Sequence, residues 1–513
     1  MSNASALLRS LIVYGLCLPL AVFLGYLLAN PLDLNTLVVT GIVLFILVVP
    51  LLLRWHHAWL IATWNMSAVL FFLPGRPPLW TGLAVVSLAI GVLQYTINRN
   101  AKFLYVPSVT WPLLFFGVVV LITMSLTGGI GLRVLGSSSY GGRNYFGIFA
   151  AIIGYFALTS RRIPPKRAGL YVSLFFLGSA TMAIGDLPLV LPREFNFVYL
   201  MFPLLQTGSE ALQDTSVVGP SAIAMRVTGL GFLSGAIFSV MMARYGIRGI
   251  LLEWAKPWRV ILLVFVVFLG MLGGFRSTLI VFLMTFAVLF YLERLHQTRM
   301  LPVLLVVVLL GGTLMATFAN RLPFMMQRSM AFLPVNIDPL ARLSAAGTSE
   351  WRLQMWKELL PQVPQYLILG KGYSFNAGEM IMTEYRGGLE GTMLTGEYHN
   401  GPLSVIIPFG IFGAIGFLWF LWAGLRVTYQ NFQFGDPAYH RINTFLFAFF
   451  VVKIIFFLAI FGGLVTDLTM FAALVGLSVS LNGGVAKPAV APQPQVVFNR
   501  FKLHPSAHRP VGV

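Results

Sequence analysis

Along most of its length the chain alternates long apolar stretches with short polar or Gly/Pro-rich breaks. Apolar segments of about 16 to 25 residues are long enough to cross the core of a bilayer as helices. About fourteen such segments can be counted, at 7–29, 35–53, 57–73, 79–97, 111–130, 145–160, 168–186, 227–243, 258–275, 277–292, 301–318, 401–425, 442–463 and 465–481. The pattern predicts an all-α polytopic integral membrane protein with about 12 to 14 transmembrane helices.

One long polar interruption, residues 319–400, separates the last apolar segments from the others. We expect a large, partly helical loop there, and loops held by a rigid scaffold are where binding and catalytic residues concentrate. The chain then divides into an N-terminal transmembrane region, helices leading to the loop, the loop itself, C-terminal helices and a disordered tail rich in Pro, Ala and Val. Their bounds are 1–254, 255–318, 319–400, 401–481 and 482–513.

Composition supports a membrane protein. The chain of 513 residues is 58% hydrophobic and 10% charged, with a mean hydropathy of +0.84, and a soluble fold could not bury so much apolar surface. The net charge of +18 would suggest nucleic acid in a soluble protein. In a membrane protein it indicates basic cytoplasmic loops and sites for anionic lipid or phosphate, so no nucleic-acid partner is expected.

The single cysteine, Cys17, excludes intrachain disulfides and cysteine metal clusters. No His, Asp or Glu residues have metal-ligand spacing, so neither a metal nor a cofactor is predicted. Arg9 precedes the first apolar run, but no small-residue cleavage site follows, which predicts an uncleaved first helix.

Basic residues in the short loops predict the orientation. With the N-terminus in the cytoplasm, the loops that fall inside are the richer in Lys and Arg from about residue 97 onward. The inside residues are Arg54, Arg99, Lys102, Arg161, Arg162, Lys166, Arg167, Arg244, Arg248, Lys256, Arg259, Arg294, Arg299, Arg426 and Arg441. Both termini are then cytoplasmic, and the long loop and Arg276 lie outside.

Arg276 stands between two apolar runs, after Gly273-Gly274-Phe275. An arginine at a helix end can simply extend into the lipid headgroups. Alternatively, its planar guanidinium group is suited to holding a phosphate or diphosphate at the membrane surface.

His399 is the only histidine of the long loop and lies where the chain re-enters apolar sequence. It is either a hydrogen-bonded structural residue beside the Asn400-Gly401-Pro402 turn, or a general base that orients or deprotonates a hydroxyl group. Glu397 is close enough in sequence to pair with His399 and is the rival candidate for the base.

Residues 349–360 have the pattern of an amphipathic helix, with Ser349 as its N-cap and Trp351, Met355 and Leu359 along one face. This helix either only covers the bundle or turns Arg352 toward the same cavity as Arg276. The pattern favours neither alternative.

Two lysines are further candidates. Lys371, in Leu369-Gly370-Lys371-Gly372-Tyr373, lies in a tight glycine turn and is a possible second phosphate contact. Lys453 falls near the middle of an expected span, where a charge is a functional hypothesis by default. Asp467 is its candidate partner.

The order of these features resembles the bacterial O-antigen ligase and O-antigen polymerase family, over roughly residues 255–430. The motifs that carry the resemblance are Gly274-Phe275-Arg276-Ser277, Arg352 with Trp356, Leu369-Gly370-Lys371-Gly372-Tyr373, His399-Asn400-Gly401-Pro402-Leu403, and the glycine-rich stretch from Phe409 to Gly416.

The resemblance implies metal-independent glycosyl transfer at the periplasmic face of the inner membrane. The donor would be a glycan on undecaprenyl diphosphate, and the acceptor a sugar hydroxyl on lipid A-core or on a growing chain. Arg276 would bind the diphosphate, Arg352 would assist, and His399 would orient or deprotonate the acceptor hydroxyl. Lys371, Glu397 and Asn400 are expected to contribute to substrate binding.

Three other functions remain open. A polymerase of the same family would use the same donor with a different acceptor. A flippase would suit many spans, but the spans are nearly free of charge and a flippase has no need of the long loop. A non-catalytic member of a polysaccharide export complex would not depend on Arg276 or His399.

Overall fold

The computed structural model describes residues 14–15, 17–23, 25–26, 34–97, 103–131, 137, 139–189, 191–204, 227–376, 378–379, 381, 393–394 and 396–488. Most of these residues are helical. The helices are α2 (Leu34–Thr63), α3 (Leu79–Ile97), α4 (Pro107–Thr127), α5 (Gly142–Thr159), α6 (Ala168–Leu177), α7 (Met182–Asp186), α8 (Val198–Met201), α10 (Thr228–Leu251), α11 (Trp258–Leu272), α12 (Arg276–Leu292), α13 (Met300–Phe318), α14 (Phe324–Ser329), α15 (Pro339–Leu359), α16 (Val363–Tyr366), α19 (Gly401–Phe434), α20 (His440–Ala459) and α21 (Leu464–Asn482). Strands β1 (Ser139–Tyr140) and β2 (Phe375–Asn376) pair antiparallel.

The expected all-α membrane architecture is confirmed, whereas the count of fourteen spans is not. Within the described residues, 8 helices are long and apolar enough to cross a membrane, or 9 with the bent helix α2. Helices α11 and α12 are apolar but shorter. The expected first span, 7–29, and the expected tail, 482–513, lie mostly outside the described residues.

The expected spans 35–53 and 57–73 fall on α2, which consists of two helical pieces, Val38–Pro50 and Leu53–Thr63, that meet at a bend of 112°. The backbone is non-helical at Trp55, and the second piece covers only the first part of the expected span 57–73. It ends at Thr63, and the chain then forms turns up to a bridge between Val69 and Pro78. Beyond this end the backbone nitrogens of Ser67 and Val69 donate to Thr181 Oγ1 at 3.0 Å and to Met201 O at 2.9 Å, so this stretch is bonded to other segments instead of to a further helical turn.

Helix α21 is the centre of the bundle, and 78% of its apolar window is buried. Small residues allow its neighbours to approach closely. A Cβ at Gly476 would lie 3.0 Å from the side chain of Leu158 on α5, and one at Gly424 of α19 would lie 2.8 Å from Val475. Close packing of this kind is the main source of helix association in membranes, where apolar side chains gain little by leaving lipid.

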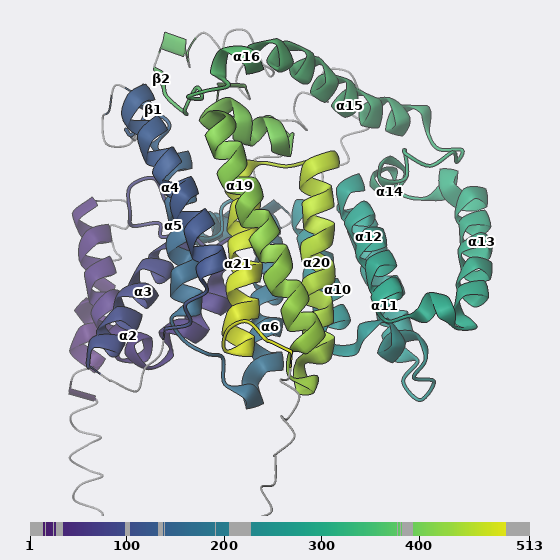
Figure 1. Cartoon of the computed structure of the whole chain (residues 1–513), viewed down its shortest axis with the longest axis horizontal. Helices are drawn as coiled ribbons and strands as arrows, with labels where there is room; N and C mark the ends of the chain where they lie inside the picture. Colours follow the sequence, from purple (N-terminus) through teal and green to yellow (C-terminus); the bar gives the residue numbers. More distant parts are fainter. Residues whose placement is uncertain are drawn as a thin grey trace, which may run out of the picture.

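The two ends of the bundle differ (Figure 1). Helices α14, α15 and α16 lie across one end, which we call the roof, and the N-terminal ends of α12 and α19 and the turn between α20 and α21 reach the same end. Helix α13, at the edge of the molecule, has no buried residue. In a bilayer it would therefore be surrounded by lipid.

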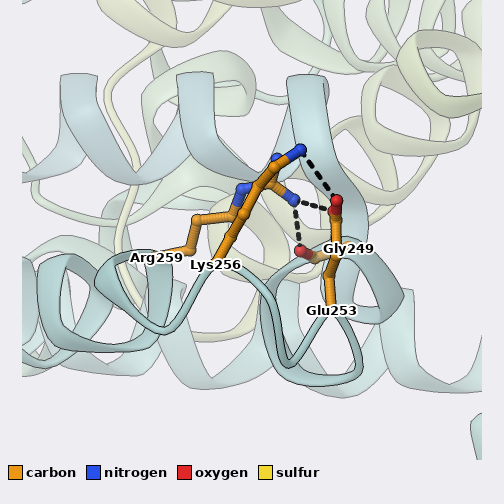
Figure 2. A network of polar contacts seen from close by, with 4 residues as sticks. All are labelled: Gly249, Glu253, Lys256 and Arg259. Atoms are coloured by element: carbon orange, nitrogen blue, oxygen red, sulfur yellow. Dashed lines mark hydrogen bonds and ion pairs between the residues drawn. The ribbon is translucent and has the colours of Figure 1, made fainter.

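The connection from α10 to α11 lies at the opposite end and is held by a polar network (Figure 2). Arg259 donates to the carbonyl oxygen of Gly249 at 2.7 Å and to the carboxylate of Glu253, which also pairs with Lys256 at 2.8 Å. The Arg259 guanidinium lies 4.0 Å from the centre of the Tyr245 ring. This network fixes the start of α11, the helix whose other end leads to Arg276.

Candidate active site

Arg276 is the first residue of α12 and points to the roof. The preceding turn bends at Gly274, which has a φ of 73° that a side chain would disfavour. The Nη2 atom of Arg276 donates hydrogen bonds to α15, at 3.0 Å to Ala345 O, 3.1 Å to Thr348 Oγ1 and 3.2 Å to Ser349 Oγ. Arg276 is only partly buried. It therefore joins the roof to the transmembrane bundle.

Helix α15 begins eleven residues earlier than the sequence pattern predicted, at Pro339 rather than near Glu350. The prediction that Ser349 caps this helix is wrong. Asp338 is the N-cap, and its side chain accepts a hydrogen bond from the backbone of Leu340 at 2.8 Å. An N-cap aspartate followed by proline is a known start signal that the sequence interpretation missed. Ser349 instead lies within the helix, where its hydroxyl contacts Arg276.

Arg352 and His399 meet at one aromatic ring. The guanidinium carbon of Arg352 lies 5.1 Å from the centre of the Phe461 ring. The His399 ring lies between two aromatic side chains, with its centre 5.1 Å from that of Phe461 and 5.4 Å from that of Trp351. Helix α15 thus places Trp351 and Arg352 beside His399. The preceding turns of the same helix, from Ala345 to Ser349, accept the hydrogen bonds of Arg276.

His399 has an unusual backbone and an unusual environment. Its φ of 48° is left-handed, which is uncommon outside glycine and is concentrated at functional sites. Burial, together with the smaller effect of the positive charge of Arg352, lowers the pKa of His399 from 6.5 to about 4. The imidazole is therefore neutral near pH 7 and can accept a hydrogen bond from a hydroxyl group.

The residues beside His399 have structural roles. The Asn400 side chain caps α19 by accepting a hydrogen bond from Leu403 N at 3.0 Å. On the other side, the indole nitrogen of Trp356 donates to Tyr398 O at 3.0 Å. These two bonds fix the chain just before and just after His399.

Two other expected site residues are not drawn into this cluster. Glu397 is exposed, and its carboxylate forms no ion pair with any residue that the structure describes, His399 included. Lys371 is held through its backbone, which donates to Ile407 O at 2.8 Å, and the backbone of Gly372 donates to Pro408 O at 3.0 Å. The expected glycine turn is present and docks against the kink of α19, which is centred on Gly410.

The close docking of this turn leads to a prediction for Gly370. Its φ is 78°, and a Cβ there would overlap the carbonyl group of Pro408. We expect Gly370→Ala to lower the free energy of unfolding by at least about 1 kcal/mol, measured as a lower melting temperature in detergent. Gly311→Ala, in open space on α13, is the matched control, and equal melting temperatures for the two variants would contradict the prediction.

The expected partner of Lys453 is confirmed. Its Nζ lies 3.1 Å from Oδ1 of Asp467, and the side chains are 18% and 8% exposed. The second carboxylate oxygen of Asp467 accepts from Gly463 N at 3.0 Å. The ion pair therefore ties α20 to α21 just below the turn that carries Phe461.

Removing one member of this pair should lower the stability of the protein. Lys453→Met leaves the Asp467 carboxylate buried without its counter-charge, and we expect a loss of about 3–5 kcal/mol of stability. The double variant Lys453→Met/Asp467→Asn removes both charges and should recover most of that loss, as read from thermal unfolding in detergent. A double variant less stable than the single variant would show that the unpaired Asp467 carboxylate is not what destabilises Lys453→Met.

Two guanidinium groups and a neutral imidazole thus lie at the roof end of the bundle. Guanidinium groups bind phosphate oxygens with two parallel hydrogen bonds, and the imidazole can accept from a hydroxyl. Among the residues that the structure describes, no group of three or more His, Cys, Asp or Glu side chains lies together in the manner of metal ligands. The arrangement suits an anionic ligand with a hydroxyl-bearing second substrate.

Comparison with known proteins agrees with this geometry. A family model described as O-antigen ligase matches residues 260–418. No curated protein matches the chain. The match runs from α11 into α19 and includes Arg276, Arg352 and His399, so the family resemblance drawn from the sequence motifs is confirmed. Phe461 lies beyond the matched segment.

Proposed function

Because the chain carries an O-antigen ligase family domain at residues 260–418, we propose that it transfers a glycan from undecaprenyl diphosphate to a sugar hydroxyl. One observation carries the proposal: α15 brings the surroundings of Arg276, Arg352 and His399 to the same end of a transmembrane bundle. A lipid-linked diphosphate would present its headgroup at that level of the membrane. The acceptor would be lipid A-core or a growing polysaccharide.

We propose that this end faces the periplasm and that both termini are cytoplasmic, in the bacterial inner membrane. The support is the distribution of basic residues in the short loops, which are richer in Lys and Arg on the opposite side. Residues 319–400 would then form a periplasmic loop. This loop would build the site together with the helices of residues 255–318 and 401–481. Residues 1–254 would serve as a membrane scaffold.

In the proposed reaction the acceptor oxygen attacks the anomeric carbon, and the bond from that carbon to the diphosphate oxygen breaks. Negative charge grows on the leaving diphosphate. Arg276 and Arg352 would stabilise this charge, because fixed cations aimed at developing charge lower the barrier directly. With the charge balanced by two arginines, the step as proposed needs no metal ion.

His399 would bind the acceptor hydroxyl as a neutral imidazole. Its pKa of about 4 makes it a weak base in the empty site. An anionic donor beside Arg352 would offset the positive charge that contributes to this low pKa, so the basicity of His399 would rise when the donor binds. The proton would then pass to His399 as the new glycosidic bond forms. Lys371, Glu397 and Asn400 remain proposals for contacts to the substrates.

The test is glycan transfer by the purified protein in liposomes, with an undecaprenyl-diphosphate-linked glycan as donor. A new glycosidic bond supports the proposal. A product on lipid A-core identifies a ligase, and a lengthened lipid-linked chain identifies a polymerase. Movement of the donor across the bilayer without a new bond would instead identify a flippase and overturn the proposal.

A further inference from the structure

The turn between α20 and α21, residues Ile460–Gly463, forms one side of the candidate site although it lies beyond the family-matched segment. Its side chain Phe461 contacts both functional groups at once. The ring lies 5.1 Å from the Arg352 guanidinium carbon and 5.1 Å from the centre of the His399 ring. No other ring among those described is shared by these two residues in this way.

Hydrogen bonds to α20 and α21 and a close backbone contact with α19 hold this turn in place. The backbone nitrogen of Phe461 donates to Phe456 O at 2.9 Å, which ends α20. The Gly463 nitrogen donates to Asp467, the partner of Lys453. A Cβ at Gly462 would lie only 2.8 Å from the Cα of Gly401, the first residue of α19. The position of Phe461 is therefore fixed relative to both α19 and α21.

We propose that Phe461 is a positioning residue that sets the orientation of Arg352 and His399 for catalysis, and that the Lys453–Asp467 pair holds it there. This inference rests on the proposed function. The ring acts in two separable ways. Its face attracts the guanidinium group, which fixes Arg352 without using any of its hydrogen-bond donors. Its apolar bulk also keeps water from the His399 imidazole.

These two effects predict different results for two substitutions. Phe461→Leu keeps apolar bulk but removes the aromatic face, so Arg352 loses its orientation and KM for the donor should rise about three- to thirtyfold. Phe461→Ala removes both, and hydration of His399 should in addition raise its pKa from about 4 toward 6.5. Phe461→Tyr keeps the ring and should retain most of the wild-type behaviour.

A pH profile separates positioning from mere packing. The charged groups on the elements around His399 are Arg352 on α15, Glu397 on its own segment, and the Lys453–Asp467 pair on α20 and α21. None of these is altered in the Phe461 variants. For Phe461→Ala, kcat/KM for the donor, which reports the free enzyme, should therefore fall between about pH 7 and pH 5, where the wild type and Phe461→Leu stay constant. Phe447→Leu, an aromatic position in the N-terminal half of α20, more than three helical turns from Phe461, is the control.

A second measurement does not depend on activity. Diethyl pyrocarbonate acylates neutral imidazole, and peptide mass spectrometry reports the reaction at His399 alone. In the wild type the pH dependence of this modification should be flat above about pH 5, whereas in Phe461→Ala its midpoint should move toward 6.5. Normalising each protein to its own plateau removes the effect of altered access.

The outcomes distinguish failure of the proposed function from failure of the proposed role of Phe461. Absence of transfer by the wild type would overturn the proposed function, yet the modification midpoints would still test the position of Phe461. Wild-type transfer with unchanged KM in Phe461→Leu and an unchanged midpoint in Phe461→Ala would overturn the inference alone. Equal losses in the Phe461 variants and in Phe447→Leu would reduce Phe461 to a packing residue and would also overturn it.

Discussion

Arg276→Ala should lower the rate of glycan transfer by about a hundred- to a thousandfold, because it removes a fixed cation from the leaving diphosphate. Arg276→Lys should recover only part of this rate. A lysine keeps the charge, but its compact ammonium group cannot reproduce the planar pair of hydrogen bonds to phosphate oxygens. Initial rates of transfer in liposomes, at saturating acceptor and varied donor, measure both effects.

The control must separate catalysis from the attachment of the roof. Arg276 donates three hydrogen bonds to α15, so its loss could also loosen that helix. Arg342→Ala is the matched control for an arginine bonded to the roof. Arg342 lies on α15 and donates to Val335 O at 2.6 Å. We expect wild-type transfer from it. An Arg276→Ala protein that melts like the wild type and transfers at the wild-type rate would contradict the assigned role.

His399→Ala should lower transfer by about a hundred- to ten-thousandfold, the range that general acid–base groups contribute. His399→Gln separates the two roles still open for this residue. The glutamine amide can accept a hydrogen bond from a hydroxyl but cannot take up a proton near neutral pH. Substantial activity in His399→Gln would favour orientation of the acceptor, and a loss equal to that in His399→Ala would favour proton transfer.

The pKa of His399 also predicts the acid side of the wild-type profile. A group with a folded pKa of about 4 remains neutral from pH 8 down to about pH 5, so kcat/KM for the donor, which reports the free enzyme, should be constant there and fall only as the pH approaches 4. Full loss of activity near pH 6.5 would contradict the lowered pKa. His440→Gln, exposed at the other end of the bundle, should behave as the wild type at every pH.

Much of the transmembrane architecture could be predicted from apolar segment length alone. Helices α11 to α13, α20 and α21 begin and end near the expected bounds, whereas α10 and α19 begin there but run 8 and 9 residues further. The agreement arises because a span has a minimum length and a membrane tolerates few charges within it. The same criterion failed at α2. Two apolar segments separated by Arg54 look like two full spans, whereas the structure has two shorter helical pieces that meet at a bend of 112°.

The sequence pattern singles out candidate site residues whose chemistry is rare in this chain and does not single out one whose residue type is common. Arg276, Arg352 and His399 are unusual residues in an apolar chain, and the structure places all three at the roof end, although their roles stay predictions. Phe461 could not be found in this way. With 43 phenylalanines in the sequence, nothing local marks the one that contacts His399, and its contacts depend on packing between distant helices.

The position of Phe461 also bears on how the protein is made. Arg276, Arg352 and His399 all leave the ribosome before α20 and α21, so a nascent chain holds every proposed reactive group before it holds the turn that aligns them. During synthesis the N-terminal parts of a chain generally gain structure first. Under the proposed function, a nascent chain would accordingly hold Arg352 and His399 without the Phe461 ring beside them, and would use the donor less efficiently, until its last helix pair inserts.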